Sequence, residues 1–291
     1  MKYGFFPGCV LEGASKEDYL ATVAVAKKLG IEIEELEGWT CCGASHVQDI
    51  DPLLAVSTNA RNIALAEKKG LNVLTVCNTC TLMLREAKNE LDEDANKKQQ
   101  VNNILGQAGM EYKGTSDVTH FLWVLIRDYG LDKLKEKVVK PLTGLRVAEY
   151  YGCHILRPEG EMGFEDFQIP TSLKDLIEAI GATPIDFSRK LDCCGFHAVY
   201  PAHDSVMQMT GSINRDAVNE GADCVVTPCP LCQMQLDMFQ KEAAAVVAKD
   251  KDMPILHMSQ LIGLALGVTP EEMGMPKRHL TSTASLNRFI A

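Results

Sequence analysis

The stretch CCGASH, residues 41–46, and its counterpart CCGFH, residues 193–197, decide how this sequence is interpreted. Two adjacent cysteines are poorly placed to form a disulfide, because a bridge between neighbouring residues is strained. In an extended strand their side chains would point to opposite faces. In a tight turn both can point inward, and Gly43 or Gly195 after each pair supplies the backbone freedom for it. The pairs therefore predict two turns, each of which brings adjacent thiols to one site.

Composition indicates a cytoplasmic globular protein. The chain has 291 residues, a formal net charge of −10 and 46% hydrophobic residues. This length suggests about two domains, and nucleic-acid binding would need a basic surface that an acidic chain does not favour. The N-terminus lacks the apolar segment of a signal peptide, and the most apolar run, LIGLALGV (261–268), is too short to cross a bilayer. We expect no nucleic-acid partner and no membrane span.

The reducing cytoplasm disfavours disulfides among the eleven cysteines, which makes metal ligation or redox chemistry the better interpretation. Ten of them form two sets of five in the same order. The first set is Cys9, Cys41, Cys42, Cys77 and Cys80, and the second is Cys153, Cys193, Cys194, Cys229 and Cys232. Four members are offset by 152 residues and the first by 144, because an additional polar loop follows Cys153.

The sequence around the cysteines is repeated as well. VLTVCNTCTLML (73–84) matches VVTPCPLCQMQL (225–236). Self-similarity at a fixed offset is the signature of internal duplication. We therefore expect two homologous domains, residues 1–143 and 144–291.

Each half alternates short apolar strands with helices, which predicts parallel βαβ units. In the first half, a strand within 3–9 precedes a helix at 16–30, and a strand at 72–76 precedes a helix that the CxxC motif opens. Loops at the carboxyl ends of parallel strands gather at one edge of a sheet. The sequence thus predicts an α/β fold of two Rossmann-like βαβ domains, with the five thiols of each half converging at the strand ends.

Five convergent thiols exceed what common sites require. A lone CxxC is compatible with a thioredoxin-like pair or half a zinc site, whereas a c-type haem would need a following histidine. A structural zinc site takes four ligands, and so does an ordinary cubane iron–sulfur cluster. We infer a multi-iron cluster with irregular ligation in each half, in preference to zinc or free thiols; a zinc-stabilised scaffold without redox function remains an alternative.

The cysteine pattern is Cys-x31-Cys-Cys-x34-Cys-x2-Cys in the first half and Cys-x39-Cys-Cys-x34-Cys-x2-Cys in the second. It resembles the cysteine-rich CCG domain, and two copies without further domains resemble the B subunit of heterodisulfide reductase from methanogenic archaea. The resemblance implies that each set of five cysteines holds a noncubane [4Fe-4S] cluster. It also implies that the mixed disulfide of coenzyme M and coenzyme B is reduced to two thiols between the two clusters, in the last step of methanogenesis.

The resemblance further implies partners. The chain lacks the CxxCxxCxxxCP run of ferredoxins, so electrons would come from the separate ferredoxin-like subunit of the heterodisulfide reductase. That protein would be supplied by the flavin-containing subunit, with a hydrogenase or formate dehydrogenase beyond it. CCG domains also occur in electron-transfer subunits of lactate-, glycolate- and glycerol-3-phosphate-oxidising complexes and in thiol:fumarate reductase. An electron-transfer role of that kind is the alternative, although the complete set of ten cysteines favours the disulfide reductase.

Thiol release needs protons, and histidine is the side chain best suited to deliver them near neutral pH. His154 follows Cys153, and His197 lies three residues after Cys194. We expect at least one of these two histidines to be catalytic; the alternative is a hydrogen bond to cluster sulfur or backbone. His46 could contribute to the same pocket.

The substrate would be anionic, with sulfonate, carboxylate and phosphate groups. Arg157, Arg189 and Lys190 are the candidate anchors, although each could instead be a solvated surface charge.

Four further features have structural interpretations. His120 and His257 stand at matching places before apolar helices, which predicts a capping role in both halves. Cys224, in a predicted strand, is expected to be a buried core thiol. The segment 276–291 could dock on a partner or fray.

Overall fold

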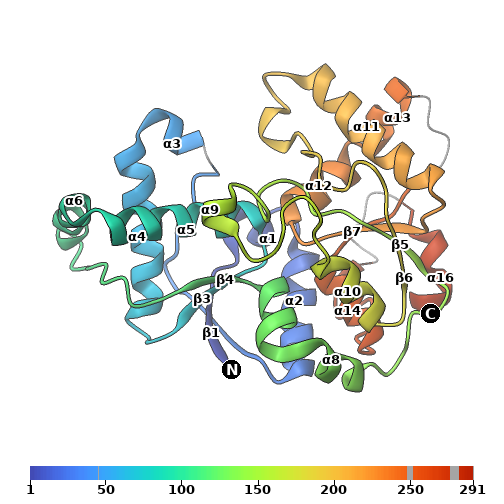
Figure 1. Cartoon of the computed structure of the whole chain (residues 1–291), viewed down its shortest axis with the longest axis horizontal. Helices are drawn as coiled ribbons and strands as arrows, with labels where there is room; N and C mark the ends of the chain where they lie inside the picture. Colours follow the sequence, from blue (N-terminus) through green and yellow to red (C-terminus); the bar gives the residue numbers. More distant parts are fainter. Residues whose placement is uncertain (45, 248–251, 276–281, 291) are drawn as a thin grey trace.

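The computed structural model describes residues 1–44, 46–247, 252–275 and 282–290. Each half of the chain contains a four-stranded parallel sheet with helices between its strands (Figure 1). The strand order is β2-β1-β3-β4 in the first sheet and β6-β5-β7-β8 in the second. The predicted α/β class and the two similar halves are therefore confirmed.

The first half contains, in chain order, β1 (Lys2–Phe5), α1 (Gly8–Glu12), α2 (Lys16–Leu29), β2 (Glu32–Glu35), α3 (His46–Ile50), α4 (Pro52–Glu67), β3 (Asn72–Thr75), α5 (Asn78–Glu93), α6 (Ala95–Gly106), β4 (Val118–His120), α7 (Phe121–Trp123), the π-helical segment η1 (Val124–Gly130) and α8 (Leu131–Lys137).

The second half contains β5 (Arg146–Glu149), α9 (Glu159–Met162), α10 (Ser172–Ala179), β6 (Thr183–Ile185), the 3-10 turn η2 (Phe196–Ala198), α11 (His203–Asn219), β7 (Cys224–Thr227), α12 (Pro230–Met238), α13 (Gln240–Val247), β8 (Ile255–His257), α14 (Met258–Ala265), the 3-10 turn η3 (Ala284–Leu286) and α16 (Asn287–Ile290).

The two sheets repeat one pairing register. Tyr3 of β1 lies opposite Asn72 of β3, and Val147 of β5 lies opposite Cys224 of β7. The central strands β3 and β7 are short apolar runs, as expected when helices cover both faces of a parallel sheet. Cys224 is fully buried in this core, and burial raises the pKa of its thiol. The prediction of a core thiol is confirmed.

Local sequence signals explain where helices begin and end. Asp51 caps α4 by accepting a hydrogen bond from the Leu54 amide at 3.0 Å, and Pro52 occupies the first helical position. Gly30 ends α2 in the left-handed conformation that favours glycine. The sequence did not predict α1, which begins at Gly8, so Cys9 lies in a short helix and not at the end of a strand.

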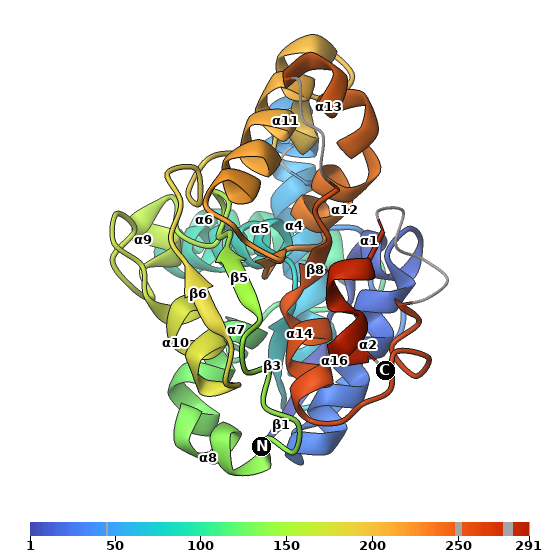
Figure 2. The same ribbon diagram turned by 90° about the vertical axis from the view of Figure 1, so that its right-hand side faces the viewer.

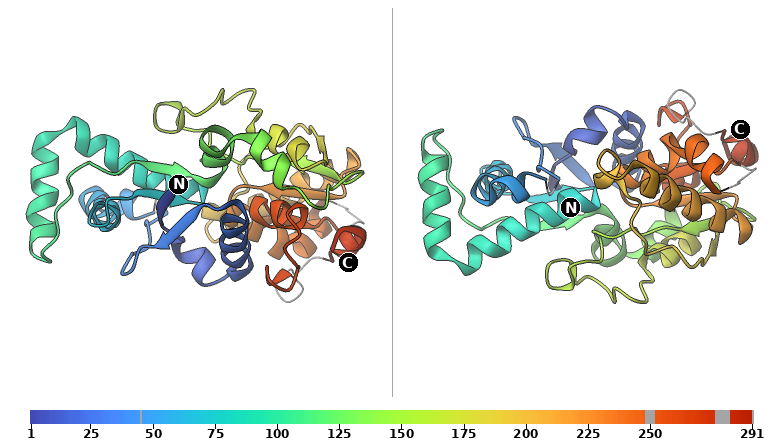
Figure 3. Two further views of the ribbon diagram at one scale, coloured as in Figure 1. Left: turned by 90° about the horizontal axis from the view of Figure 1, so that it is seen from below. Right: turned by 90° about the horizontal axis from the view of Figure 1, so that it is seen from above.

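The halves pack through equivalent helices. In the first half α2 lies against α14 of the second half, and in the second half α10 lies against α7 and α8 of the first. Figure 2 shows α14 in front of α2, and Figure 3 shows the two halves side by side from below and above. A hydrogen bond of 3.0 Å joins the hydroxyls of Thr22 and Ser259 at the first contact.

Part of the segment 276–291 packs on the chain itself. Residues 276–281 and 291, to which the docking prediction also applied, lie outside the described residues. Within the described part, Leu286 is buried, and Lys140 Nζ donates to the carbonyl of Phe289 at 2.9 Å. The last short helix is therefore held against the junction between the halves.

Two buried histidines cap matching helices. His120 accepts a hydrogen bond at Nδ1 from the Leu122 amide at 3.1 Å, and His257 accepts one from the Ser259 amide at 3.3 Å. This confirms the predicted cap role in both halves. Burial lowers the pKa of His120 to about 3 and that of His257 to about 4, so both rings are neutral at pH 7.

The same histidines also join the halves. A neutral imidazole that accepts at Nδ1 carries its proton on Nε2 and donates there. His120 Nε2 lies 3.1 Å from the Pro228 carbonyl in the second half, and His257 Nε2 lies 3.1 Å from the Val76 carbonyl in the first. Each carbonyl directly precedes a CxxC motif. The exchange therefore fixes each CxxC against the other half.

We expect His120→Asn to separate these two roles. Asparagine is a good helix cap, but it is too short to reach Pro228, so a buried carbonyl loses its donor. The free energy of unfolding should fall by about 1–3 kcal/mol, the cost of an unsatisfied buried group, measured by chemical denaturation under anaerobic conditions. His257→Asn is the matched variant and should behave alike. Unchanged stability in both would show that the cross-half bonds do not hold the halves together.

Candidate metal centre

The first five cysteines converge although they come from three separate segments. Cys9 lies in α1, Cys41 and Cys42 form a turn, and Cys77 caps α5, whose first turn carries Cys80. The Sγ atoms of Cys41 and Cys9 are 3.6 Å apart, and those of Cys42 and Cys80 are 3.5 Å apart. All of these except Cys41 line one cavity of about 90 Å³.

The second five cysteines repeat this arrangement. Cys194 and Cys232 Sγ are 3.4 Å apart, which matches the pair of Cys42 and Cys80. All five members of the second set line one cavity. The predicted convergence of thiols at the carboxyl ends of the strands is thus what the structure contains.

The two cavities share a wall. Thr79, Phe196 and Leu231 line both of them. The thiols of Cys77 and Cys229, one from each set, interact directly by a hydrogen bond where the cavities meet. The two thiol sets are therefore neighbours in the middle of the molecule, where the halves meet.

In each set, hydrogen bonds among neighbouring thiols lower the pKa of some cysteines and raise that of their partners, and the thiolate is the form that binds metals. Hydrogen bonds with Cys42 and Cys9 lower the pKa of Cys41 to about 2. Hydrogen bonds with neighbouring thiols lower the pKa of Cys193 to about 2, and the bond with Cys153 has the largest effect. Burial opposes ionisation of Cys229, but hydrogen bonds, including that with Cys77, outweigh it and lower its pKa.

The predicted turns after the cysteine pairs depend on glycine. Gly43 has φ +86° and Gly195 has φ +84°, a region that side chains disfavour. The Gly195 amide donates to Cys193 Sγ at 3.3 Å. The turn separates each adjacent pair, so that Cys41 faces Cys9 while Cys42 faces Cys80.

Sequence reasoning missed two further glycines at the site. Gly8 and Gly152 precede the first cysteine of each set and have φ +76° and φ +70°. A Cβ on Gly8 would lie 3.0 Å from Cys80 Sγ, and one on Gly152 would lie 3.1 Å from Cys232 Sγ. The repeated Gly-Cys dipeptide was the available signal, and its role is to leave room for the CxxC sulfur.

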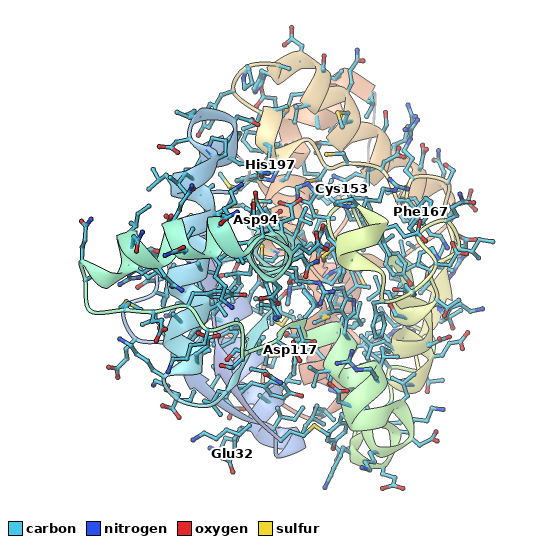
Figure 4. The ribbon with its side chains drawn as sticks, turned by 60° about the vertical axis from the view of Figure 1, so that its left-hand side comes forward. Glu32, Asp94, Asp117, Cys153, Phe167 and His197 are labelled. Carbon is cyan, nitrogen blue, oxygen red and sulfur yellow. The ribbon has the colours of Figure 1, made fainter. Side chains whose placement is uncertain are left out.

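The structure brings three predicted histidines together. The ring of His197 lies 5.4 Å from that of His46 and 5.6 Å from that of His154, between ring centroids. His154 Nδ1 lies 2.9 Å from the Thr79 hydroxyl in the other half. Figure 4 shows His197 and Cys153, which line the same cavity.

The environment of His197 favours its neutral form. Burial, followed by the nearby His154, lowers its pKa. Its Nδ1 is buried without a hydrogen-bond partner in the described part of the chain. His46, in contrast, is exposed. The three rings thus lie in a row that begins at the cavity lined by Cys153 and ends at the exposed His46.

The three basic residues predicted to bind substrate already have partners of their own within the chain. Arg189 forms ion pairs with two carboxylates, including Asp216 at 2.9 Å. Lys190 forms one with the buried Glu149 at 2.7 Å. Arg157 donates to a backbone carbonyl, and none of the three is among the described residues that line the two thiol cavities.

The fold and site define a duplicated α/β protein whose two thiol sets meet at a shared wall. The model of the CCG family, a cysteine-rich domain, matches residues 3–85 and 147–237. The chain therefore belongs to the CCG family, with one matched region in each half.

Relatives of full length are found in two kinds of oxidoreductase complex. The chain is 50% identical to the 8-methylmenaquinol:fumarate reductase membrane anchor subunit of Wolinella succinogenes, over 97% of this chain and 98% of that one. It is 35% identical to the B subunit of the ferredoxin/F420H2-dependent CoB-CoM heterodisulfide reductase of Methanosarcina acetivorans, over 99% and 97%. A hypothetical protein from Helicobacter pylori has a similar fold, with a TM-score of 0.78 and 14% identity over 97% of this chain and 52% of that one.

One relative is named as a membrane anchor subunit. Within the described residues, no helix is both long and apolar enough to cross a membrane.

We expect Gly152→Ala to disrupt the second thiol set selectively. The new Cβ would press on Cys232 Sγ and would hold alanine in a left-handed conformation that costs about 1–2 kcal/mol. Iron and sulfide per chain, measured after anaerobic purification, should fall to half of the wild-type content. Gly160→Ala is the control, because a Cβ there meets nothing within 4 Å. Full metal content in Gly152→Ala would contradict the steric role.

Proposed function

We propose that this chain is the electron-transfer subunit of a quinol-linked fumarate reductase complex. Residues 1–143 and 144–291 would each form one CCG domain, and the ten cysteines would hold two noncubane [4Fe-4S] clusters. The observation that carries the proposal is the pair of adjacent cavities, lined by four thiols of the first set and by all five of the second, in a chain that is 50% identical to a methylmenaquinol:fumarate reductase subunit over nearly its full length.

The residues fit such clusters. Each half offers five converging cysteines, one more than zinc or a cubane cluster needs. Three thiols are strongly acidified, Cys41, Cys193 and Cys229. When bound, the clusters would supply one-electron transfer. The chain itself holds the ligands in two sets that meet at one wall, so that electrons need not cross the protein between separate sites.

The polarity of the first cavity favours a quinol over an anionic disulfide. Besides its cysteines it is lined by apolar groups such as Val10, Ala44, Phe196 and Leu231, and no charged residue is among its described lining. The cluster would fill the thiol-lined part of this cavity, so an uncharged quinol ring would approach the cluster along these apolar groups. The mixed disulfide of coenzyme M and coenzyme B carries anionic groups, which are costly to bury without partners.

The chemistry balances for quinol oxidation. Oxidation of one quinol to the quinone releases two electrons and two protons, and reduction of fumarate to succinate consumes two of each. His197 is held neutral, so it can accept a proton near the thiol cavities. His154 and the exposed His46 adjoin it and can pass the proton to water.

The partners would be a ferredoxin-like iron–sulfur protein and a flavin-containing protein that reduces fumarate. Because quinols dissolve in the bilayer, the complex would act at the cytoplasmic face of a membrane, attached through its surface or through another component of the complex.

Heterodisulfide reduction is the second candidate. The three clustered histidines favour it, since they could protonate two thiolates released beside the clusters, and the B subunit of a heterodisulfide reductase is 35% identical over the full chain.

Purification of the tagged chain from its native host under anaerobic conditions tests the proposal. We expect about eight irons and eight sulfides per chain, as two four-iron clusters require, together with a copurifying flavoprotein. The complex should oxidise a reduced menaquinone analogue with fumarate as acceptor. Stoichiometric zinc with little sulfide would remove the cluster proposal. Reduction of the coenzyme M–coenzyme B disulfide without quinol oxidation would replace the first candidate with the second.

The histidine cluster has its own test. We expect His154→Ala and His197→Ala to keep their iron, and at least one to slow turnover on the order of 10²-fold, a typical contribution of acid–base catalysis. Electron exchange with the partner protein, followed by stopped-flow absorbance, should be nearly unchanged. His203→Ala on α11 is the control, because this exposed ring contacts Glu242 and not the thiol cavities. Wild-type turnover in both variants would assign the histidines a structural role, and lost iron would make them residues that support the clusters.

A further inference from the structure

A third cavity lies on the first half, away from the thiols. Its volume is about 320 Å³. It is lined near the amino ends of β1, β3 and β4, whereas the thiols lie at the carboxyl ends of the strands. Its described lining contains no cysteine, and it consists mostly of polar and charged side chains: Tyr3, Asn72, Arg85, Asp117, Thr119, Trp123, Arg127 and Asp128, with Val118.

Arg85 is the first sign that this cavity receives an anion. The guanidinium is half-buried on α5 and donates only to carbonyls, through Nε to Glu161 O at 2.5 Å and through Nη1 to Val118 O at 3.1 Å. In the described part of the chain, no carboxylate forms an ion pair with it. A partly buried charge is normally paired.

Two buried donors give the second sign. Trp123 is 3% exposed and Thr119 is 7% exposed. The indole Nε1 of Trp123 and the hydroxyl of Thr119 have no hydrogen-bond partner among the described residues, and both residues line the cavity. Buried polar atoms of this kind are rare in folded proteins. The indole is held in place because it stacks on Phe164, with ring centroids 5.3 Å apart and planes at 14°.

We infer that this cavity binds a small molecule through one oxyanion, a carboxylate or a phosphate. Arg85 would supply the charge, and Trp123 Nε1–H and the Thr119 hydroxyl would donate hydrogen bonds to the oxygens. All three belong to elements around one cavity, α5, α7 and β4. The indole N–H and the guanidinium can only donate, so this part of the site suits a ligand group that only accepts.

The charged residues at the rim of the cavity limit the charge that the rest of the ligand can carry. Asp128 is neutralised by Arg127, 2.6 Å away, and also accepts from the Tyr3 hydroxyl at 3.4 Å. Asp117 is exposed at the rim and forms no ion pair in the described part. A second anionic group would meet this carboxylate, so the remainder of the ligand is expected to be uncharged or cationic.

Calorimetric titration of the full metal-loaded chain tests the site, with inorganic phosphate and propionate as separate probes. We expect saturable binding of one molecule of at least one probe. Binding of phosphate alone would identify a phosphate ligand, and binding of propionate alone a carboxylate ligand; either supports the inference. Thr119→Val keeps the shape and removes only the hydroxyl, so it should weaken binding about 10- to 100-fold, as for a hydrogen bond to a charged group.

The controls keep the inference falsifiable. Thr183→Val makes the same exchange on the edge strand β6, outside the cavity, and should bind as the wild type does. Arg85→Gln should abolish binding, with iron content as a check that α5 still holds its cysteines. Absence of saturable binding for both probes would overturn the inference. Equal affinity in Thr119→Val and Thr183→Val would overturn it as well.

Discussion

The exchange of hydrogen bonds between His120 and the Pro228 carbonyl, and between His257 and the Val76 carbonyl, is the constraint on which the centre depends. Each bond reaches across the halves to the residue before a CxxC motif. Because both rings are fully buried and neutral, each must accept at Nδ1 and donate at Nε2. Each histidine thus caps a helix and joins the halves at the same time. The bonds between the halves set how closely the two thiol sets approach each other.

Absent side chains are as important to the site as present ones. Gly8 and Gly152 leave space for the sulfurs of Cys80 and Cys232, because any Cβ would come within about 3 Å of them. The glycine after each cysteine pair does a different task, since it permits the turn that directs adjacent thiols to different neighbours. Sulfur atoms are large, so a site of five thiols needs backbone that can approach closely without a side chain.

The charges around the thiols distinguish between the two candidate functions, quinol oxidation and heterodisulfide reduction. Carboxylates form ion pairs with Arg189 and Lys190, so little positive charge is left for an anionic substrate near the thiols. Arg85, in contrast, forms no ion pair with a carboxylate among the described residues, and it lies at the third cavity, away from the thiols. The chain therefore separates an apolar, thiol-lined centre from a polar cavity suited to an oxyanion.

The sequence by itself determined the α/β class, the duplication and the convergence of ten cysteines, because these depend on periodicity and spacing along the chain. It also identified the capping histidines, from their matching places before the helices, and the core thiol Cys224, from its predicted strand. It could not reveal that Nε2 of those histidines reaches the other half, that the two catalytic candidates and His46 form one cluster, or that two of the basic candidates are already paired. Those facts depend on contacts between residues that lie apart in the sequence, from 27 positions for Arg189 and Asp216 to 181 for His257 and Val76, and only tertiary packing decides that. The physical reason is that side-chain direction and partner distance are set by the packing of helices on both sheets, not by local propensity.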